Sequence, residues 1–572
     1  MTHRIPRTLS HLSASVAVTA LALAGVTGGT TAVWAHDQGN GHAHAPEIPD
    51  DAAVPLFDGL GDQHFEISTQ SPQAQAYFDQ GLTLTYGFNH FEAVRSFEEA
   101  VRHDPDCAMC HWGIALALSP HINAPMDPAA VEPAHAAVTR AQELANTVTE
   151  REQAYIAALA ERYAAEAPED RSALDRAYAE AMGRLAEDHP SDLDAWTLYA
   201  EALMNLVPWN YWTEDGSPRP ETERLVAALE RVLARSPDHA GAAHLYIHAM
   251  ENSVTPEAAE AAADTLRDLD IQIGHMIHMP SHIYARIGRW HDASVANEAA
   301  VAADATYLSA FEVEGLVPVL YHPHNYHFLA WTASVEGRHE RARNAAAELL
   351  AAAPTSLAAD LPFLQKFLVA PVLVELRFAD WDAVLATEPP ADLPYVAHLH
   401  GFARAMAHIA QGDLTVARDK SEALADFAAS DEAATMEMPE AFYPAHTILR
   451  IADATLAGEI ALAEGDPLAA IDHFEQAVEL QDALPYMEPP YWFNSARLDL
   501  GRAHLAADQP AEAAAVFEAD MTEYPENGWA LHGLAASLSA QGKTEAAEEA
   551  AARFRAAWHD DGTDLESLQR AW

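Results

Sequence analysis

Apolar and small residues recur along this chain at helical spacing rather than in the strict alternation of a strand. The pattern is clearest from Ala74 to Pro105, where a proline ends the run. Counted from Ala74 as position 1, the marked residues stand at positions 4, 8, 11, 20, 24, 27 and 32: Tyr77, Gly81, Leu84, Ala93, Phe97, Ala100 and Pro105. Offsets of three and four keep side chains on one helix face, so the run predicts two antiparallel helices.

This spacing resembles the tetratricopeptide repeat, in which small residues lie where the two helices cross and a proline ends the second helix. The spacing returns near the other end of the chain, first at Gly458, Ala470, Phe474 and Ala477, and then at Gly501, Ala513, Phe517 and Pro525. Degenerate copies fill the middle. We therefore predict an all-α fold, a right-handed superhelical solenoid of tetratricopeptide-type hairpins, with no sheet.

The N-terminus predicts export. Arg4 and Arg7 precede the apolar stretch 14–26. In Val33-Trp34-Ala35, Val33 and Ala35 are the small residues that a signal-peptide cleavage site after Ala35 needs. We expect a signal peptide at 1–35, a flexible histidine-containing segment at 36–70, and repeats at 71–235, 236–350 and 351–572. The mature protein would be periplasmic or secreted, without an integral membrane span. The tail histidines His36, His42 and His44 either collect metal ions or belong to a plain linker.

Charge and missing motifs exclude several functions. The formal net charge is -54, from 86 acidic and 32 basic residues, and such a surface repels nucleic acid and anionic membranes. The chain has no phosphate-binding loop, no dinucleotide-type glycine turn, no Gly-x-Ser-x-Gly and no His-Glu-x-x-His. Nucleotide-dependent chemistry and the common serine hydrolase mechanisms are therefore not expected.

Histidines concentrate at repeat positions that face the groove. In tetratricopeptide arrays, side chains at positions 2, 5, 9 and 12 of the first helix line the concave surface. Repeats that start at Ala240, Gly274 and Pro323 place seven histidines and one glutamate at these positions: His244, His248, Glu251, His275, His278, His282, His324 and His327. Three other histidines, His398, His400 and His408, fall at other repeat positions. The eight residues are candidate ligands of one site.

Neutral imidazole is the commonest ligand of transition metals, and a carboxylate completes many sites. Eight ligands exceed the four of one tetrahedral ion, so the pattern indicates two ions, or one ion with supporting residues. Zn, Cu and Fe all suit this ligand set. A polar substrate groove and ordinary packing are the alternatives.

The two cysteines stand in Cys107-Ala108-Met109-Cys110-His111. This motif is typical of covalent haem c attachment with His111 as axial ligand. The alternatives are a disulfide or redox pair, as expected in an oxidising compartment, and a soft-metal site for Cu(I). Both cysteines fall at groove positions 2 and 5 of a repeat that starts at Asp106, so we expect them to be accessible.

Several longer motifs resemble a family of exported bacterial tetratricopeptide proteins. They are Phe78 to Gly81, Tyr86 to His90, His278 to Tyr284, Tyr321 to Phe328, Glu488 to Pro490 and Asn527 to Leu531. The resemblance covers nearly all of the mature chain and implies the fold and the export. It carries no activity over.

Two functions remain open at this point. The groove is either a scaffold that holds a protein, peptide or small ligand, with a transition metal in a structural or sensing role, or the site of a periplasmic metalloenzyme, redox or hydrolytic. In the second case Glu251 is a candidate general base. A haem c-carrying repeat protein is a third interpretation, and it depends on the cysteine motif alone.

Overall fold

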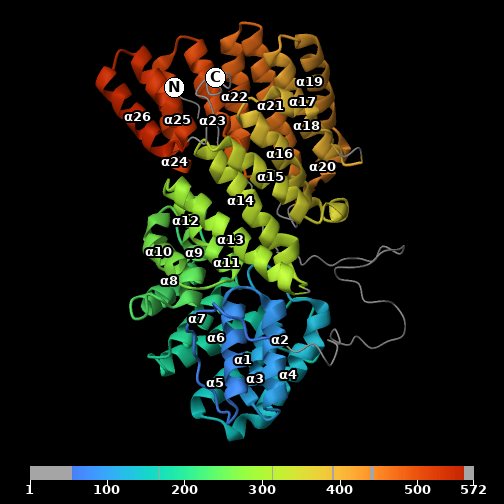
Figure 1. Ribbon diagram of the computed structural model, residues 1–572, viewed down its shortest axis with the longest axis vertical. Helices are drawn as coiled ribbons and strands as arrows, with labels where there is room; N and C mark the ends of the chain where they lie inside the picture. The colour runs from blue at the N-terminus through green and yellow to red at the C-terminus, as the bar shows by residue number, and fades with distance from the viewer. Residues whose placement is uncertain (1–53, 167, 312, 390–391, 439–442, 560–572) are drawn as a thin grey trace, which may run out of the picture.

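The computed structural model describes residues 54–166, 168–311, 313–389, 392–438 and 443–559 (Figure 1). Within these ranges the all-α prediction is confirmed, because helices follow one another in antiparallel hairpins over the whole length. The signal peptide predicted at 1–35 and the tail histidines His36, His42 and His44 lie outside the described residues.

The helices fall into three regions, which are coloured blue to teal, green, and yellow to red in Figure 1. The N-terminal region holds α1 (Pro72–Tyr86), α2 (His90–His103), α3 (Ala108–Ala117), η1 (Pro128–Ala130), α4 (Val131–Leu144), η2 (Ala145–Thr147), α5 (Glu150–Ala160), α6 (Ser172–Asp188), α7 (Leu193–Met204) and α8 (Pro220–Leu233). The central region holds α9 (Ala240–Met250), η3 (Pro256–Ala259), α10 (Glu260–Asp268), α11 (Gly274–His278), α12 (Pro280–Arg286), α13 (Trp290–Ala310), η4 (Val317–Tyr321), α14 (His322–Val335) and α15 (His339–Ala352).

The C-terminal region holds η5 (Thr355–Leu357), η6 (Pro362–Leu364), α16 (Gln365–Arg377), α17 (Trp381–Ala386), α18 (Pro394–Ala410), α19 (Leu414–Ala428), α20 (Asp431–Thr435), β1 (Glu437–Met438), β2 (Tyr443–Pro444), α21 (Ala445–Ala463), α22 (Pro467–Asp482), α23 (Ala496–Ala506), α24 (Pro510–Glu523), α25 (Gly528–Ala540) and α26 (Thr544–Ala557). The short antiparallel pair β1–β2 corrects the expectation of no sheet. Two residues per strand are too few for an alternating pattern to reveal.

Small residues at the helix crossings explain why the hairpins close. A Cβ on Gly81 would lie 2.8 Å from the Phe97 ring, and a Cβ on Gly501 would lie 2.3 Å from the Phe517 ring. These glycines and phenylalanines are the residues that the sequence placed at repeat positions 8 and 24. Only glycine lets the second helix bring its aromatic ring against the backbone of the first, so the local pattern directly determines the hairpin packing.

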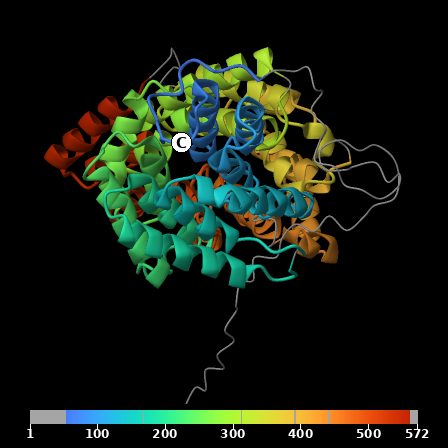
Figure 2. The same ribbon diagram turned by 90° about the horizontal axis from the view of Figure 1, so that it is seen from below.

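The C-terminal region folds back onto the central region. The Trp290 indole donates a hydrogen bond to the Pro525 carbonyl at 2.8 Å, and the Trp529 indole donates one to the Ser334 carbonyl at 3.0 Å. The central region lies between the N-terminal and C-terminal regions along the long axis (Figure 1), and Figure 2 views the molecule down that axis. The two indole contacts therefore join the central helices to the C-terminal region.

Residues 54–70, the described part of the segment predicted at 36–70, pack along the repeats. The Tyr77 hydroxyl donates to the Val54 carbonyl, and the Gln272 amide donates to the Gly59 carbonyl. Phe65 is buried in the N-terminal core. No helix among the described residues is long and apolar enough to cross a membrane.

Candidate metal centre

Six histidines from the central helices meet in the interior as two sets of three. The first set is His244, His248 and His275, and the second is His278, His282 and His324. Within each set, one ring nitrogen from every histidine lies within 4.8 Å of the others. The two sets adjoin, because the rings of His275 and His278 are 6.1 Å apart. We call the space that both sets enclose the histidine chamber.

Hydrogen bonds orient the first set. The Nδ1–H of His244 donates to the Tyr86 carbonyl at 2.6 Å, which leaves a lone pair on its Nε2. That Nε2 lies 3.1 Å from Nε2 of His275. His248 donates from Nδ1 to Glu251 at 3.0 Å, and its buried Nε2 has no hydrogen-bond partner in the described structure. Two Nε2 lone pairs therefore point into the chamber.

The second set is oriented in the same manner. The Asn297 amide donates to the Ala293 carbonyl, so its Oδ1 accepts the Nδ1–H of His278 at 2.7 Å. The Nε2 atoms of His278 and His282 are 2.9 Å apart. The His324 ring lies 4.8 Å from that of His278. A partner that fixes Nδ1 and leaves Nε2 to the metal is the usual arrangement around metal-binding histidines.

Two carboxylates hold the remaining nitrogen of His282. Its Nδ1 lies 2.8 Å from Glu251 and 2.9 Å from Glu488. Burial alone would lower the pKa of His282, but the two negative charges raise it to about 10. Burial would also raise the pKa of Glu251, but the charge of His282 and the hydrogen bonds from His282 and His248 lower it to about 2. Burial raises the pKa of Glu488. Without a metal, this group is a buried ion pair.

The other chamber histidines are neutral in the metal-free protein. Burial lowers the pKa of His244, His275, His278 and His324 well below 6.5, and neighbouring histidines add to the effect. Burial also lowers the pKa of His248. Neutral imidazole is the form that binds metal ions, so these rings are ready as ligands at neutral pH.

Two strained aromatic residues close the first set. Phe88 and Trp209 have φ angles of 57° and 59°, in the left-handed region that bulky side chains avoid. The Phe88 ring stacks at 5.8 Å from His248, and the Trp209 ring meets His248 edge-on at 5.2 Å. Such conformations cost about 1–3 kcal/mol each and persist where surrounding structure holds them, often at functional sites.

The predicted groove residues are buried rather than exposed on an open groove. His244 and His278 are 0% exposed, and Glu251 is 1% exposed. His324 alone among the six histidines is partly exposed. The chamber therefore excludes bulk water, and the expectation of a surface lining is corrected. Phe88, Trp209 and the segment around Glu488 cover the histidine chamber. They come from different parts of the chain, so the pattern of a single repeat does not reveal them.

The structure separates His327 from the other predicted residues. Its ring packs near Phe367 and Phe493 and lines a different cavity, with Lys366. Of the eight predicted residues, seven therefore surround the chamber and one lies beside it. Sequence reasoning missed Glu488 as a carboxylate partner, although Glu488-Pro489-Pro490 was among the family-like motifs. It also missed His90 and His121, whose rings lie 4.4 Å apart and adjoin Phe88.

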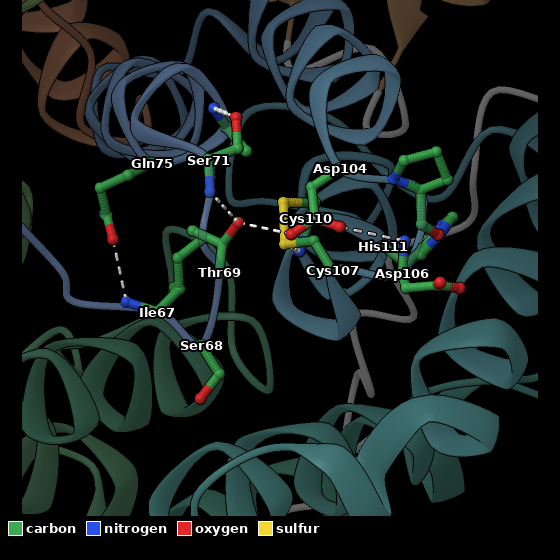
Figure 3. The surroundings of a disulfide bond; sticks show 12 residues. Ile67, Ser68, Thr69, Ser71, Gln75, Asp104, Asp106, Cys107, Cys110 and His111 are labelled. Carbon is green, nitrogen blue, oxygen red and sulfur yellow. Dashed lines mark hydrogen bonds between the residues drawn. A yellow bond between two sulfur atoms is a disulfide. The ribbon is translucent and has the colours of Figure 1, made fainter.

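The two cysteines form a disulfide bond at the start of α3 (Figure 3). Both are buried, at 1% and 0% exposure, which corrects the expectation that they are accessible. In Figure 3, Thr69 reaches from the segment before α1 to Asp104 beside this bond. The arrangement leaves no sulfur for thioether bonds to haem c and no thiolate for Cu(I), so neither interpretation fits Cys107, Cys110 and His111.

Comparison with known proteins adds little beyond this geometry. No family model matches the sequence, and no curated protein is similar to it. Among solved structures, the human IFIT1 dimer with m7Gppp-AAAA is 12% identical, with 85% of this chain and 90% of that chain covered and a TM-score of 0.28. Yeast Tom70 is 10% identical over 87% and 94% of the chains, with a TM-score of 0.27. Cut9 in its complex with Hcn1 is 12% identical over 88% and 96%, with a TM-score of 0.26. At these scores no function is carried over.

The chamber fits a transition metal on its own geometry. Four ligands at ~2.0–2.1 Å around a tetrahedral ion lie ~3.3 Å from one another. The Nε2 separations of 3.1 and 2.9 Å are close to that value. In each set, bonds to the ion would replace the contact between the two paired nitrogens. Nε2 of His248, which has no partner, would also gain a bond to the ion. The residues that would hold ions are the six histidines, with Glu251 and Glu488 supporting His248 and His282.

Proposed function

We propose that this protein is an exported metalloprotein of the tetratricopeptide type, with two adjacent three-histidine metal sites in its interior. The observation that carries the proposal is the convergence of six histidines in two sets, with four Nδ1 atoms held by a carbonyl, a carboxamide and two carboxylates. Packing alone does not require six imidazoles to face one another, since each buried imidazole costs free energy unless it is paired.

Three protein ligands per ion favour reactivity over a purely structural role. Structural zinc sites are closed by four protein ligands, whereas catalytic sites keep one position for water or substrate. The burial of the chamber strengthens electrostatic effects inside it. We therefore favour the metalloenzyme interpretation, redox or hydrolytic, over a scaffold whose groove holds a peptide, because the groove positions 240–327 are covered.

Charge balance favours copper. Glu251 and Glu488 are the carboxylates that contact the chamber histidines in the described structure. Two monovalent ions would be neutralised by these two groups, while two divalent ions need two more negative charges, such as hydroxide. An uncompensated buried charge is costly, and imidazole suits copper well. Copper with a redox role is thus our first choice, and zinc with bound hydroxide is the second.

Elemental analysis of the protein purified from the periplasm tests the proposal. We expect about two equivalents of transition metal per chain, following the two ligand sets. Replacing His278 and His282 together by alanine should remove at least one equivalent, because it leaves the second set with one histidine. The matched control replaces His398 and His408, two histidines of α18 outside the chamber, and should keep the full amount.

Fewer than one equivalent in the wild-type protein would reject the metal site. Equal metal content in the two double variants would also reject it, since the ligands would then lie elsewhere. Cleavage after Ala35, measured by the mass of the mature protein, tests the export.

A further inference from the structure

A second small cavity lies beside the histidine chamber. It lies between α14, α16, α18 and the segment that follows Glu488, and His327, Lys366, Tyr395, Tyr443, Trp492 and Phe493 are among its lining residues. Its free space is on the order of one or two water molecules. Aromatic and aliphatic side chains form most of its wall, so a charge placed there meets few polar groups.

Lys366 supplies such a charge without a counterion. Lys366 is half-buried, and no ion pair or hydrogen bond joins its ammonium to another part of the chain that the structure describes. The ammonium lies 5.3 Å from the centre of the Phe367 ring. Desolvation lowers the pKa of Lys366 to about 8, with no carboxylate acting against it. The side chain is therefore mostly charged at pH 7, in a protein whose net charge is -54.

The other polar groups at this cavity can also donate hydrogen bonds. Nδ1 of His327 is buried and has no hydrogen-bond partner within the described ranges. The hydroxyls of Tyr395 and Tyr443 are 2.6 Å apart, so one donates to the other and the second proton stays unused by the pair. An ammonium, an imidazole and a spare hydroxyl proton, with no carboxylate, are the donors that bind an anion.

We propose that this cavity binds a small monovalent anion, such as chloride or formate, paired with Lys366. The size of the cavity excludes phosphate and larger carboxylates. Lys366 lines this cavity together with His327, which lies on the same helix α14 as His324 of the second histidine set. The charge of Lys366 lowers the pKa of both His324 and His327. A bound anion would offset that charge beside the chamber. The site goes beyond the proposed metal function and does not depend on it, because none of these donors is a chamber ligand.

Selective labelling of lysine Cε with ¹³C tests the proposal directly, because the chain has only three lysines, Lys366, Lys420 and Lys543. Each pKa is measured by NMR titration in sodium gluconate, sodium chloride and sodium formate at equal ionic strength. Gluconate is too large for the cavity. We expect chloride or formate to raise the pKa of Lys366 by about one unit, since a nearby anion favours the charged amine. Lys420 and Lys543 serve as internal controls and should not respond.

A variant gives an independent readout. In Lys366→Met the anion loses its partner, so the rise in melting temperature that chloride or formate gives to the wild-type protein should disappear. The control Lys543→Met, at an exposed lysine, should keep it. A response to one anion alone identifies the occupant as halide or carboxylate. The same Lys366 pKa in all three salts would overturn the proposal, whether or not the variant folds.

Discussion

In the metal-free protein the six chamber histidines carry one proton more than six neutral imidazoles. His282 holds this extra proton, so that both its Nδ1, beside Glu251 and Glu488, and its Nε2 are protonated. The opposite pKa shifts of His282 and its neighbours have one common origin in burial and local charge. A metal ion in the second set would displace this proton from Nε2 and leave Nδ1 bonded to the carboxylates. Metal binding should therefore release about one proton at neutral pH.

The pH dependence of stability follows from these shifts. Histidines with a lowered pKa bind protons only after unfolding, so the metal-free protein loses stability as the pH falls below 6.5. Each contributes up to about 1.4 kcal/mol per pH unit. His282 acts in the opposite sense, and its stabilisation is present below 6.5 and lost as the pH rises towards about 10. Glu251 stabilises above pH 4.5 and loses this effect as the pH falls towards about 2.

We therefore expect the urea midpoint of chelator-treated protein to fall steeply from pH 7 to 5 and slowly from pH 7 to 10. In His282→Gln the alkaline decline should vanish while the acid decline remains. If the urea midpoint fell no more from pH 7 to 5 than it does in a protein without buried histidines, the result would contradict the neutral state of His244, His275, His278 and His324.

Sequence and structure agree well at the residue scale where the repeat phase is regular. His244, His248 and Glu251 follow the expected positions of α9, and His275, His278 and His282 follow those of α11 and α12. His327 departs from its expected place. It lies on the same helix α14 as His324, but the offset of three residues turns its side chain to a neighbouring direction, where it packs near Phe367 and Phe493. The repeat positions did not reveal which neighbour each side chain would meet.

At the scale of elements, one broken helix serves both histidine sets. α11 carries His275 and His278, and α12 continues the same direction from Pro280 to carry His282. An offset of three residues turns the side chain by about 300° around the helix, so His275 and His278 point to neighbouring spaces. The sequence predicted the common face but not its division between two sets.

Close contact between α1 and α9 holds the first set in place. A Cβ on Gly241 would lie 2.6 Å from the Tyr86 ring, and the Tyr86 carbonyl orients His244. In Gly241→Ala the helices must separate, so we expect a loss of about 1–3 kcal/mol of stability and weaker binding of the first metal ion. Thermal unfolding and metal titration measure both effects.

Gly401→Ala is the matched control for this prediction. Gly401 also lies inside a helix, α18, but a Cβ there would meet nothing within 4 Å. Because alanine favours the helix, this variant should gain up to about 1 kcal/mol and bind metal unchanged. Equal effects of the two substitutions would show that helix propensity, and not the contact with Tyr86, governs the result.

At the scale of the whole molecule, the chamber joins distant parts of the chain. Tyr86 comes from the first hairpin, the histidines from the central region, and Glu488 from the connection between α22 and α23. The repeat pattern predicted each hairpin because the residues that pack at its helix crossing are close in sequence, as Gly81 and Phe97 are, or Gly501 and Phe517. It did not predict that the C-terminal region covers the histidines, since contacts such as Trp290 with Pro525 are not repeated.

Metal binding should therefore protect two distant segments together. We expect hydrogen exchange to slow both in α9 and in residues 484–495 when the metal-free protein is loaded with Cu(I). Glu488→Gln weakens the contact between residues 484–495 and His282. In this variant, metal loading should still slow hydrogen exchange in α9, but it should slow exchange in residues 484–495 much less. Equal protection of 484–495 in the wild-type protein and the variant would show that Glu488 does not transmit the effect.

The position of Glu488 has a consequence for the order of assembly. A growing chain contains all six histidines once residue 324 has been made, yet the carboxylate that completes the His282 pair comes 164 residues later. Until then His282 has Glu251 alone, and the cover from the C-terminal region is missing. In the metal-binding function that we propose, tight capture of an ion would thus wait until the last hairpins dock, and the protein would take its metal from the place where it completes folding rather than from the place where it was synthesised.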